Sequence, residues 1–270
     1  MLDQVTIREL ALELHEAERT GVQVRQFSQR FPEIQFEDSY RIQREWRRIK
    51  LAEGQKSIGR KIGLTSRAMQ KVANMTEPDY GVLFDAMQIA DGSTVAADRF
   101  IQPWVEVELA FILKHDLRGT ELSIADVLAA TDWVVPAMEI IDARIQRIDP
   151  ETGIQRRIVD TIADNAANAG IVMGNKPVRP ESIDLRWIGA LLYKNGLVEE
   201  TGLAAGVLDH PANGITWLAA RLSAWDEHLS AGEIVLSGSF TRIVAASPGD
   251  QFLADYGPLG SLTLNFDSNS

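Results

Sequence analysis

The apolar positions divide the chain into a helical first part and a second part built mainly of strands. Apolar residues recur at helical spacing between Val5 and Leu14, and Gly21 ends that stretch. A second helix is predicted from Glu37 to Ala52, stopped by Gly54. Its polar face carries four arginines, which we interpret as a solvated face or a subunit contact: Arg41, Arg44, Arg47 and Arg48.

After Gly59, short apolar runs are separated by Gly, Asp, Asn and Pro, a pattern typical of strands and turns. Asn195-Gly196 indicates a tight hairpin, and helices are predicted after Ser123 and from His210-Pro211 to near Gly232. We therefore predict an α+β fold with a helical domain over residues 1–58 and a β-rich catalytic domain over 59–270. The predicted strands cover residues 61–64, 82–84, 105–113, 134–141, 170–173, 189–193, 197–201, 234–238, 252–256 and 261–266.

Composition narrows the function classes. The 270 residues carry a formal net charge of −11, which argues against nucleic acid or an anionic membrane as the main partner. No cysteine is present, so disulfides, zinc fingers and thiol nucleophiles are excluded. A signal peptide and a membrane-spanning apolar run are not recognised, and we expect a cytoplasmic protein. GxGxxG, Walker and GxSxG motifs are also missing from the sequence.

Three carboxylates lie inside apolar runs. Glu106 and Glu108 alternate with valines, and Glu139 follows Ala137-Met138 in a second run. Side chains alternate between the faces of a strand, so Glu106 and Glu108 should point the same way, about 6–7 Å apart. A hard cation would offset their repulsion, and three carboxylates without sulfur favour Mg²⁺ or Mn²⁺. The same alternation is typical of a half-exposed strand, and the residues alone leave both interpretations open.

Lys61 and Asp79 are the acid–base candidates. Lys61 lies in a short strand between Gly59 and Gly63, where it could hold an oxyanion or donate a proton, or simply be a surface lysine. Asp79 precedes Tyr80-Gly81, a good turn sequence, and could instead be a second acid–base group. We interpret His15, His115 and His228 as bystanders and His210 as a helix cap.

Two polar stretches could line a pocket. Residues 160–170 contain Asp164 and Asn165, and residues 238–242 contain Ser239 and Thr241. The hydroxyls and N–H groups of the second stretch could cradle a carboxylate, or form a plain turn. The sequence does not decide which basic residue would bind a carboxylate at the far end of the substrate. The candidates are Arg67, Lys71, Arg144 and Arg242.

Several motifs occur in one order along nearly the whole chain. They are Lys61-Ile62-Gly63-Leu64-Thr65-Ser66, Glu77-Pro78-Asp79-Tyr80-Gly81, the three glutamates, Asp164-Asn165-Ala166-Ala167, Val207-Leu208-Asp209-His210-Pro211 and Gly238-Ser239-Phe240-Thr241. Together they resemble the fumarylacetoacetate hydrolase superfamily, in its hydratase and decarboxylase branch.

The resemblance implies a mixed β-barrel-like domain with a small helical N-terminal domain, a homo-oligomer associated through the β-rich part, and a mobile lid from Gly59 to Tyr80. It implies Mg²⁺ held by Glu106, Glu108 and Glu139, with Lys61 and Asp79 as acid–base pair. The expected activity is a metal-dependent hydratase adding water to the C=C of a 2-oxo acid or dicarboxylate. A decarboxylase is the nearest alternative, and a non-catalytic partner subunit the alternative from another class. Hydrolysis of an acylpyruvate would require a His–Glu pair, and no histidine lies near the metal motifs.

Overall fold

The computed structural model describes residues 1–72 and 75–268. Its helices are α1 (Gln4–Thr20), α2 (Phe27–Arg30), α3 (Phe36–Ala52), α4 (Arg67–Val72), α5 (Ile124–Ala130), α6 (Ile158–Ala163) and α7 (Pro211–Ser223). Its strands are β1 (Ser57–Gly63), β2 (Asp79–Phe84), β3 (Gln88–Ile89), β4 (Thr94–Val95), β5 (Trp104–Leu113), β6 (Thr131–Ile141), β7 (Asn168–Met173), β8 (Gly189–Lys194), β9 (Leu197–Leu203), β10 (Ile234–Leu236), β11 (Val244–Ala245), β12 (Gln251–Asp255) and β13 (Ser261–Phe266).

The larger sheet holds the long strands β5 and β6 at its centre. Within the described residues its order is β2-β1-β10-β5-β6-β7-β3, with β11 paired to β5. The antiparallel register sets Glu106 directly opposite Glu139 and Glu108 opposite Ala137. The alternating residues Val105 and Val107 turn to the other face and enter the main apolar core. All three glutamates therefore share the face of the sheet that is turned away from this core.

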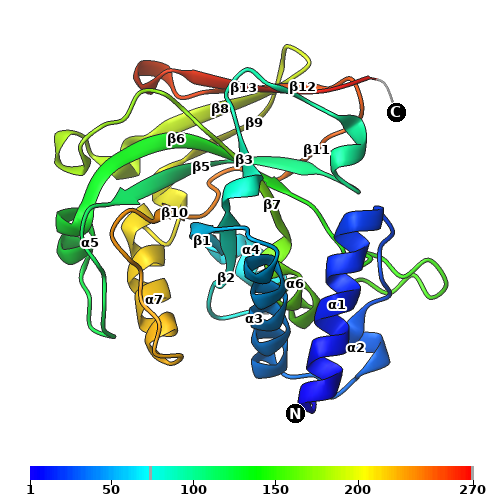
Figure 1. Cartoon of the computed structure of the whole chain (residues 1–270). Helices are drawn as coiled ribbons and strands as arrows, with labels where there is room; N and C mark the ends of the chain where they lie inside the picture. Colours follow the sequence, from blue (N-terminus) through cyan, green and yellow to red (C-terminus); the bar gives the residue numbers. More distant parts are fainter. Residues whose placement is uncertain (73–74, 269–270) are drawn as a thin grey trace.

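The smaller sheet, β4-β13-β12-β8-β9, covers that apolar core from above (Figure 1). Leu262 and Leu264 of β13 and Phe252 of β12 join the core with the valines of β5. The predicted hairpin is confirmed, since Asn195 and Gly196 both have positive φ between β8 and β9. Two stacked sheets with helices below confirm the predicted α+β class.

Helices α1 and α3 lie side by side below the larger sheet (Figure 1). Their apolar faces share a second core with the edge of that sheet, where Trp46 packs edge-on against Phe84 of β2 at 5.7 Å between ring centroids. Val159 of α6 belongs to the same core. The division into domains at residues 58 and 59 stays a prediction, although the change from helix to strand falls between Ala52 and Ser57.

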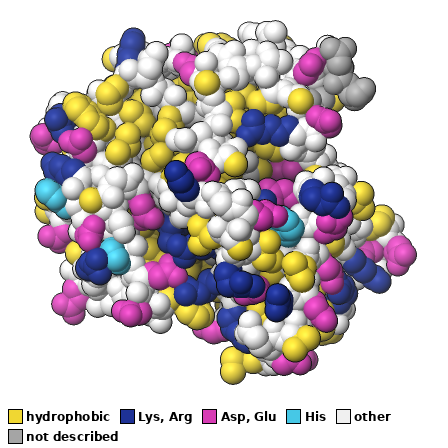
Figure 2. Space-filling model, in the orientation of Figure 1, with side chains coloured by type: hydrophobic (Ala, Val, Ile, Leu, Met, Phe, Trp, Pro, Cys, Tyr) yellow, Lys and Arg dark blue, Asp and Glu magenta, His cyan; other side chains and the backbone are white. Residues whose placement is uncertain are grey.

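Each predicted strand is present, with ends that move by up to four residues, and two expectations are wrong. Helix α7 ends at Ser223, because a positive-φ residue, Asp226, turns the chain well before Gly232. The basic face of α3 is partly an internal contact: Arg44 and Arg47 pair with Glu227 after α7, which also receives Arg60 of β1 at 3.3 Å. Figure 2 shows basic side chains gathered between α3 and α7.

Apolar spacing gave no signal for α2, α4, α6 and the short strands β3, β4 and β11. These elements are two to six residues long, too short for a period to be recognised. Among the helices of the described ranges, none combines the length and hydropathy needed to cross a membrane.

Candidate metal centre and its cavity

The three glutamates converge on one point. One carboxylate oxygen from each of Glu106, Glu108 and Glu139 lies within 4.8 Å of the other two. Glu108 and Glu139 are fully buried, and Glu106 is 9% exposed. Like charges on directly opposed strand positions repel each other, so this arrangement is unfavourable without a cation. The half-exposed-strand interpretation is therefore wrong for this face of β5.

Each of the two buried carboxylates has one oxygen fixed by the protein and one left over. The backbone N–H of Gly238 donates to Glu108 Oε2 at 2.8 Å, and Asn168 Nδ2 donates to Glu139 Oε1 at 2.7 Å. Glu108 Oε1 and Glu139 Oε2 are buried and have no hydrogen-bond partner among the described residues. Buried, unpaired carboxylate oxygens in a cluster of three glutamates fit a divalent cation that prefers oxygen ligands.

The electrostatics agree with this interpretation. Burial, and then repulsion by Glu139, raise the pKa of Glu106 to about 8. Burial and the two neighbouring glutamates likewise raise the pKa of Glu108 well above its usual value. A cation at this point would reverse both shifts, because it stabilises the ionised form.

We expect Mg²⁺ binding to release at least one proton at pH 7, because the pKa of Glu106 is raised to about 8 and that of Glu108 well above its usual value, and both carboxylates must ionise to bind. Calorimetric titration in buffers with different ionisation enthalpies measures this proton count. At pH 9.5 fewer protons should be released than at pH 7, because Glu106 is then already ionised, which is the internal control. A binding enthalpy independent of buffer at pH 7 would contradict the raised pKa of Glu106.

The same shift predicts how the stability of the metal-free protein depends on pH. The folded pKa of Glu106 lies above its unfolded value near 4.5, so its stabilising contribution is complete below 4.5 and is lost as the pH rises through about 8. The melting temperature of the metal-free protein should fall over this range. Saturating Mg²⁺ should oppose the fall.

Lys61 and Asp79 meet beside the glutamates because β1 and β2 are antiparallel neighbours, with Gly63 opposite Asp79. Lys61 Nζ lies 3.2 Å from Glu139 Oε1 and donates to the carbonyl of Ala166, also at 3.2 Å. A Cβ on Gly63 would lie 2.2 Å from Asp79 Oδ1 and 3.3 Å from Lys61 Nζ. Glycine at this position therefore leaves room for the two charged side chains.

The surroundings of the two groups shift their pKa values in ways that suit different roles, a permanently charged Lys61 and an Asp79 that can exchange a proton. Burial disfavours the charge on Lys61, but the carboxylates, led by Glu139, outweigh burial and raise the pKa of Lys61. Burial raises the pKa of Asp79, and Lys61 partly opposes this. Asp79 Oδ1 is buried and has no hydrogen-bond partner among the described residues. The turn interpretation of Asp79 is wrong, since it begins strand β2.

A left-handed turn presents the carbonyl that Lys61 contacts. Asn165, Ala166 and Ala167 have φ of 53°, 50° and 58° in succession, a conformation that costs residues other than glycine free energy. The Asn165 side chain holds the turn against β2, accepting from the N–H of Val82 at 2.7 Å and donating to its carbonyl at 3.0 Å. Strained backbone of this kind persists only where its surroundings fix it, and here it orients the lysine.

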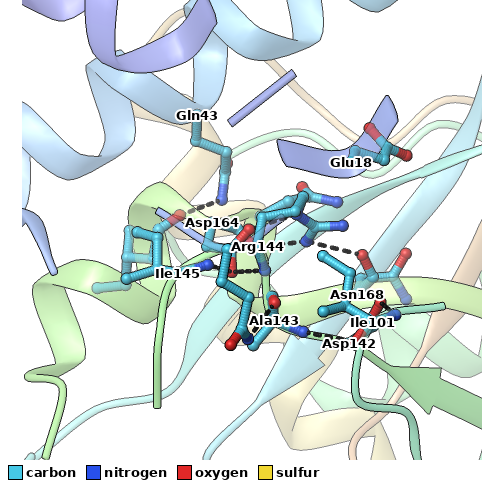
Figure 3. Close-up of polar contacts among 12 residues, drawn as sticks. Glu18, Gln43, Ile101, Asp142, Ala143, Arg144, Ile145, Asp164 and Asn168 are labelled. Carbon is cyan, nitrogen blue, oxygen red and sulfur yellow. Dashed lines mark hydrogen bonds and ion pairs between the residues drawn. The ribbon is translucent and has the colours of Figure 1, made fainter. Parts of the chain in front are cut away.

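Arg144 links this turn to the metal centre. Figure 3 shows it between Asp164 and Asn168. Its Nε pairs with Asp164 Oδ1, and its Nη2 donates to the carbonyls of Asp164 and Asn168 at 2.8 and 3.1 Å. Asn168 in turn donates to Glu139. Arg144 therefore helps to fix the backbone of Asn168, whose side-chain amide donates to one of the three glutamates.

A cavity of about 760 Å³ opens in front of these groups. Lys61, Asp79, Glu106, Ser239 and Thr241 all line it, whereas Asp164 and Asn165 do not. Asp164 is fully buried against Arg144, and Asn165 is engaged with β2. The structure therefore brings two of the four predicted substrate-binding residues into the cavity and gives the other two positioning contacts behind it.

No family model matches the chain. The chain is 54% identical to 2-oxo-hept-4-ene-1,7-dioate hydratase of Escherichia coli, over 98% of this chain and all of that protein. It is 39% identical to 2-hydroxyhexa-2,4-dienoate hydratase of Comamonas testosteroni, over 98% of this chain and 99% of that one. The crystal structure of 4-oxalocrotonate decarboxylase from Pseudomonas putida G7, complexed with magnesium and adipate, matches with a TM-score of 0.93 at 34% identity, over 98% and 99% of the two chains.

The chain belongs to the hydratase and decarboxylase branch of the fumarylacetoacetate hydrolase superfamily. The resemblance drawn from the six motifs is thereby confirmed, as is the implied fold type.

The mobile lid that the resemblance implies, from Gly59 to Tyr80, stays a prediction. Its predicted ends, near Gly59 and Tyr80, lie within β1 and β2, and β1 is hydrogen-bonded to strands on both sides. Among the described residues between these two strands, 64–72 and 75–78 lie outside the sheet. Contacts at its two ends tie it to the region of α7: Arg67 pairs with Asp209 at 3.0 Å, and Trp217 Nε1 donates to Glu77 at 3.2 Å.

The basic candidates for a distal carboxylate occupy different positions. Arg144 is buried and does not line the cavity. Arg67 and Lys71 are exposed. Arg242 lines the cavity, but its side chain is 81% exposed and pairs with Glu200. Sequence reasoning missed a fifth, Arg156, which lines the cavity wall. Its position beside Arg157 in a polar loop gave no signal.

The four histidines lie elsewhere in the described structure. His210 accepts from the N–H of Ala212 at 3.1 Å and caps α7, as predicted. His15 and His228 pair with surface carboxylates. None of them lines the cavity.

Proposed function

We propose that this chain is a Mg²⁺-dependent hydratase that converts 2-oxohept-4-ene-1,7-dioate to 4-hydroxy-2-oxoheptanedioate in the breakdown of aromatic compounds. The observation that carries the proposal is the convergence of three buried carboxylates beside a Lys–Asp pair at the base of a cavity. The 54% identity to the E. coli hydratase supports the choice of reaction and substrate. Mg²⁺ is supported by the magnesium complex of the decarboxylase, and Mn²⁺ would suit the same ligands.

Glu106, Glu108 and Glu139 would hold the cation. When bound, it would supply a Lewis acid that polarises the ketone of a chelated 2-oxo acid. Glu108 and Glu139 are each held by one hydrogen bond, from Gly238 and Asn168, and each keeps one oxygen without a hydrogen-bond partner among the described residues, available to the cation. This arrangement avoids reorganisation when the site is filled.

Lys61 would hold the developing oxyanion at C2, since its ammonium is buried and fixed by Glu139 and Ala166. Asp79 would carry protons between carbon and water. One proton leaves C3 and one is delivered to C5, which moves the double bond to C3=C4, in conjugation with the ketone. The water oxygen then bonds to C4 as a proton is returned to C3. The raised pKa of Asp79 suits a group that must both accept and donate a proton.

The test is an assay of the purified chain with Mg²⁺ and the dienol form of the substrate. We expect loss of dienol absorbance, a product heavier by one water, and no carbon dioxide. A chelator should stop the reaction, and added Mg²⁺ should restore it. A decarboxylase is the alternative, because the chain resembles 4-oxalocrotonate decarboxylase in fold. It needs a second substrate, 4-oxalocrotonate, whose carboxylate is placed so that its electrons can flow to the C2 ketone. Stoichiometric carbon dioxide from that substrate would identify a decarboxylase. If neither Mg²⁺ nor Mn²⁺ supports turnover, the result would favour the alternative that the chain is a non-catalytic partner subunit.

We also infer that copies of the chain associate through the smaller sheet. Large apolar side chains are exposed there and just before it, including Trp187 at 72% and Leu197 at 71%. Leu191 and Leu203 are exposed on the neighbouring strands. Exposed apolar side chains of this size, close together in sequence, are typical of subunit contacts.

A further inference from the structure

The cavity wall holds a buried cation that the proposed chemistry does not use. Arg156 ends the excursion between β6 and α6 and lines the same cavity as Lys61 and Glu106. Its side chain is only 15% exposed. A guanidinium removed from water to this extent normally has a carboxylate or several acceptors as partners.

Arg156 lacks such partners within the described part of the chain. Its Nη1 is buried without a hydrogen bond, and the nearest carboxylate oxygen recorded for it is Asp164 Oδ2, at 3.7 Å. That carboxylate is already committed: Asp164 accepts from Nε and the backbone N–H of Arg144 and from the N–H of Ile145. Two guanidinium groups thus share one carboxylate. Asp160 and Asp79 also act on Arg156 through their charge, but no hydrogen bond joins them to it, so a buried donor of Arg156 stays unpaired at the cavity wall.

The other cations at the cavity are engaged. Lys61 is held by Glu139 at the metal end. Arg242 is largely in solvent and pairs with Glu200 at 2.8 Å. Among the lining residues that the structure describes, Arg156 therefore combines burial, positive charge and free donors. A second anionic group on the substrate would neutralise this buried charge and accept from the free donors.

We propose that Arg156 binds the carboxylate at the far end of the substrate and so selects 2-oxo dicarboxylates over 2-oxo monocarboxylates. The inference rests on the proposed function, because it assumes that the metal centre holds the 2-oxo acid end. The guanidinium presents its donors in a fixed fork that matches a carboxylate. A methyl or methylene end would leave the guanidinium buried and unpaired, which disfavours monocarboxylates.

The experiment compares two saturated ligands that need no turnover, 2-oxoheptanedioate and 2-oxoheptanoate, by calorimetry on the Mg²⁺-loaded protein. In Arg156→Gln, we expect the preference for the dicarboxylate to fall roughly 10- to 100-fold, the usual effect of one charge-assisted contact. In Arg156→Lys, the preference for the dicarboxylate should lie between those of the wild type and Arg156→Gln, since lysine keeps the charge but lacks the forked donors of a guanidinium. The matched control is Arg157→Gln, next in sequence and exposed, where the preference should not change.

Three outcomes decide the inference. A preserved preference in Arg156→Gln would overturn it, and so would equal losses for both ligands, which would indicate a structural role. A selective loss for the dicarboxylate supports it. The proposed hydratase activity can fail separately: if the wild type turns over no 2-oxo-alkenoate, the calorimetric comparison still decides the role of Arg156. Melting temperatures of the variants check that each is folded.

Discussion

Replacing Glu108 with glutamine is expected to make the metal-free protein more stable while abolishing its response to Mg²⁺. The substitution removes one of three mutually repelling buried carboxylates and keeps an oxygen that can accept from Gly238. Without metal, the melting temperature should rise above that of the wild type, because repulsion and burial raise the pKa of Glu108. With Mg²⁺, the stabilisation seen in the wild type should be lost.

Turnover by Glu108→Gln should fall by about 1,000-fold or more, because a bound cation contributes several kcal/mol of charge stabilisation in reactions of this kind. The matched control is Glu45→Gln, a glutamate paired with Arg48 on α3, away from the cavity. Thermal melts with and without Mg²⁺, together with steady-state rates, give both readouts. A variant that still gains stability from Mg²⁺ would show that the cation binds elsewhere.

Replacing Lys61 with methionine should separate metal binding from catalysis. Lys61 offsets four nearby carboxylates, namely Glu139, Asp79, Glu106 and Glu108. Its loss should destabilise the metal-free protein by about 3–5 kcal/mol, the usual effect of breaking a buried ion pair. Mg²⁺ should restore most of that stability and bind at least as tightly as in the wild type, because the lysine no longer competes for Glu139.

Turnover of Lys61→Met should nevertheless stay down by about 1,000-fold, even at saturating Mg²⁺, because the oxyanion loses a buried donor. Lys194→Met is the matched control, since Lys194 pairs with Asp250 in the smaller sheet. The assays are Mg²⁺ titration followed by calorimetry, chemical unfolding and initial rates. Near-normal turnover at saturating metal would exclude Lys61 from the chemistry and leave it a structural counter-ion.

The glutamates could be predicted because their signal is local. Glu106 and Glu108 have the period of a strand and lie among apolar residues, and only the opposition of Glu139 depends on the register. That register is set by residues far apart in sequence. The local pattern therefore could not exclude the alternative that Glu106 and Glu108 lie on the solvent face of a half-exposed strand. For Lys61, the flanking glycines were the visible sign of crowding, and the structure shows that Gly63 makes room for Asp79.

The residues that position the site were harder to predict from the sequence. Asp164 and Asn165 lie in a polar stretch of the kind that lines pockets, but their partners, Arg144 and Val82, come from distant segments. Arg156 gave no signal beside Arg157, since nothing in the neighbouring sequence reveals which of the two side chains turns inward. Local patterns therefore identified the groups that face a metal, and tertiary contacts decided which groups support them.

The left-handed turn at Asn165, Ala166 and Ala167 has a consequence for how this protein can change. Each of these residues is held in a conformation that costs about 1–2 kcal/mol outside glycine, and together they aim the carbonyl that receives Lys61. Substitutions that relax the backbone here could raise the melting temperature. The Lys61 ammonium would then lose the carbonyl that orients it. Laboratory selection for thermal tolerance and selection for rate would pull these three positions in opposite directions.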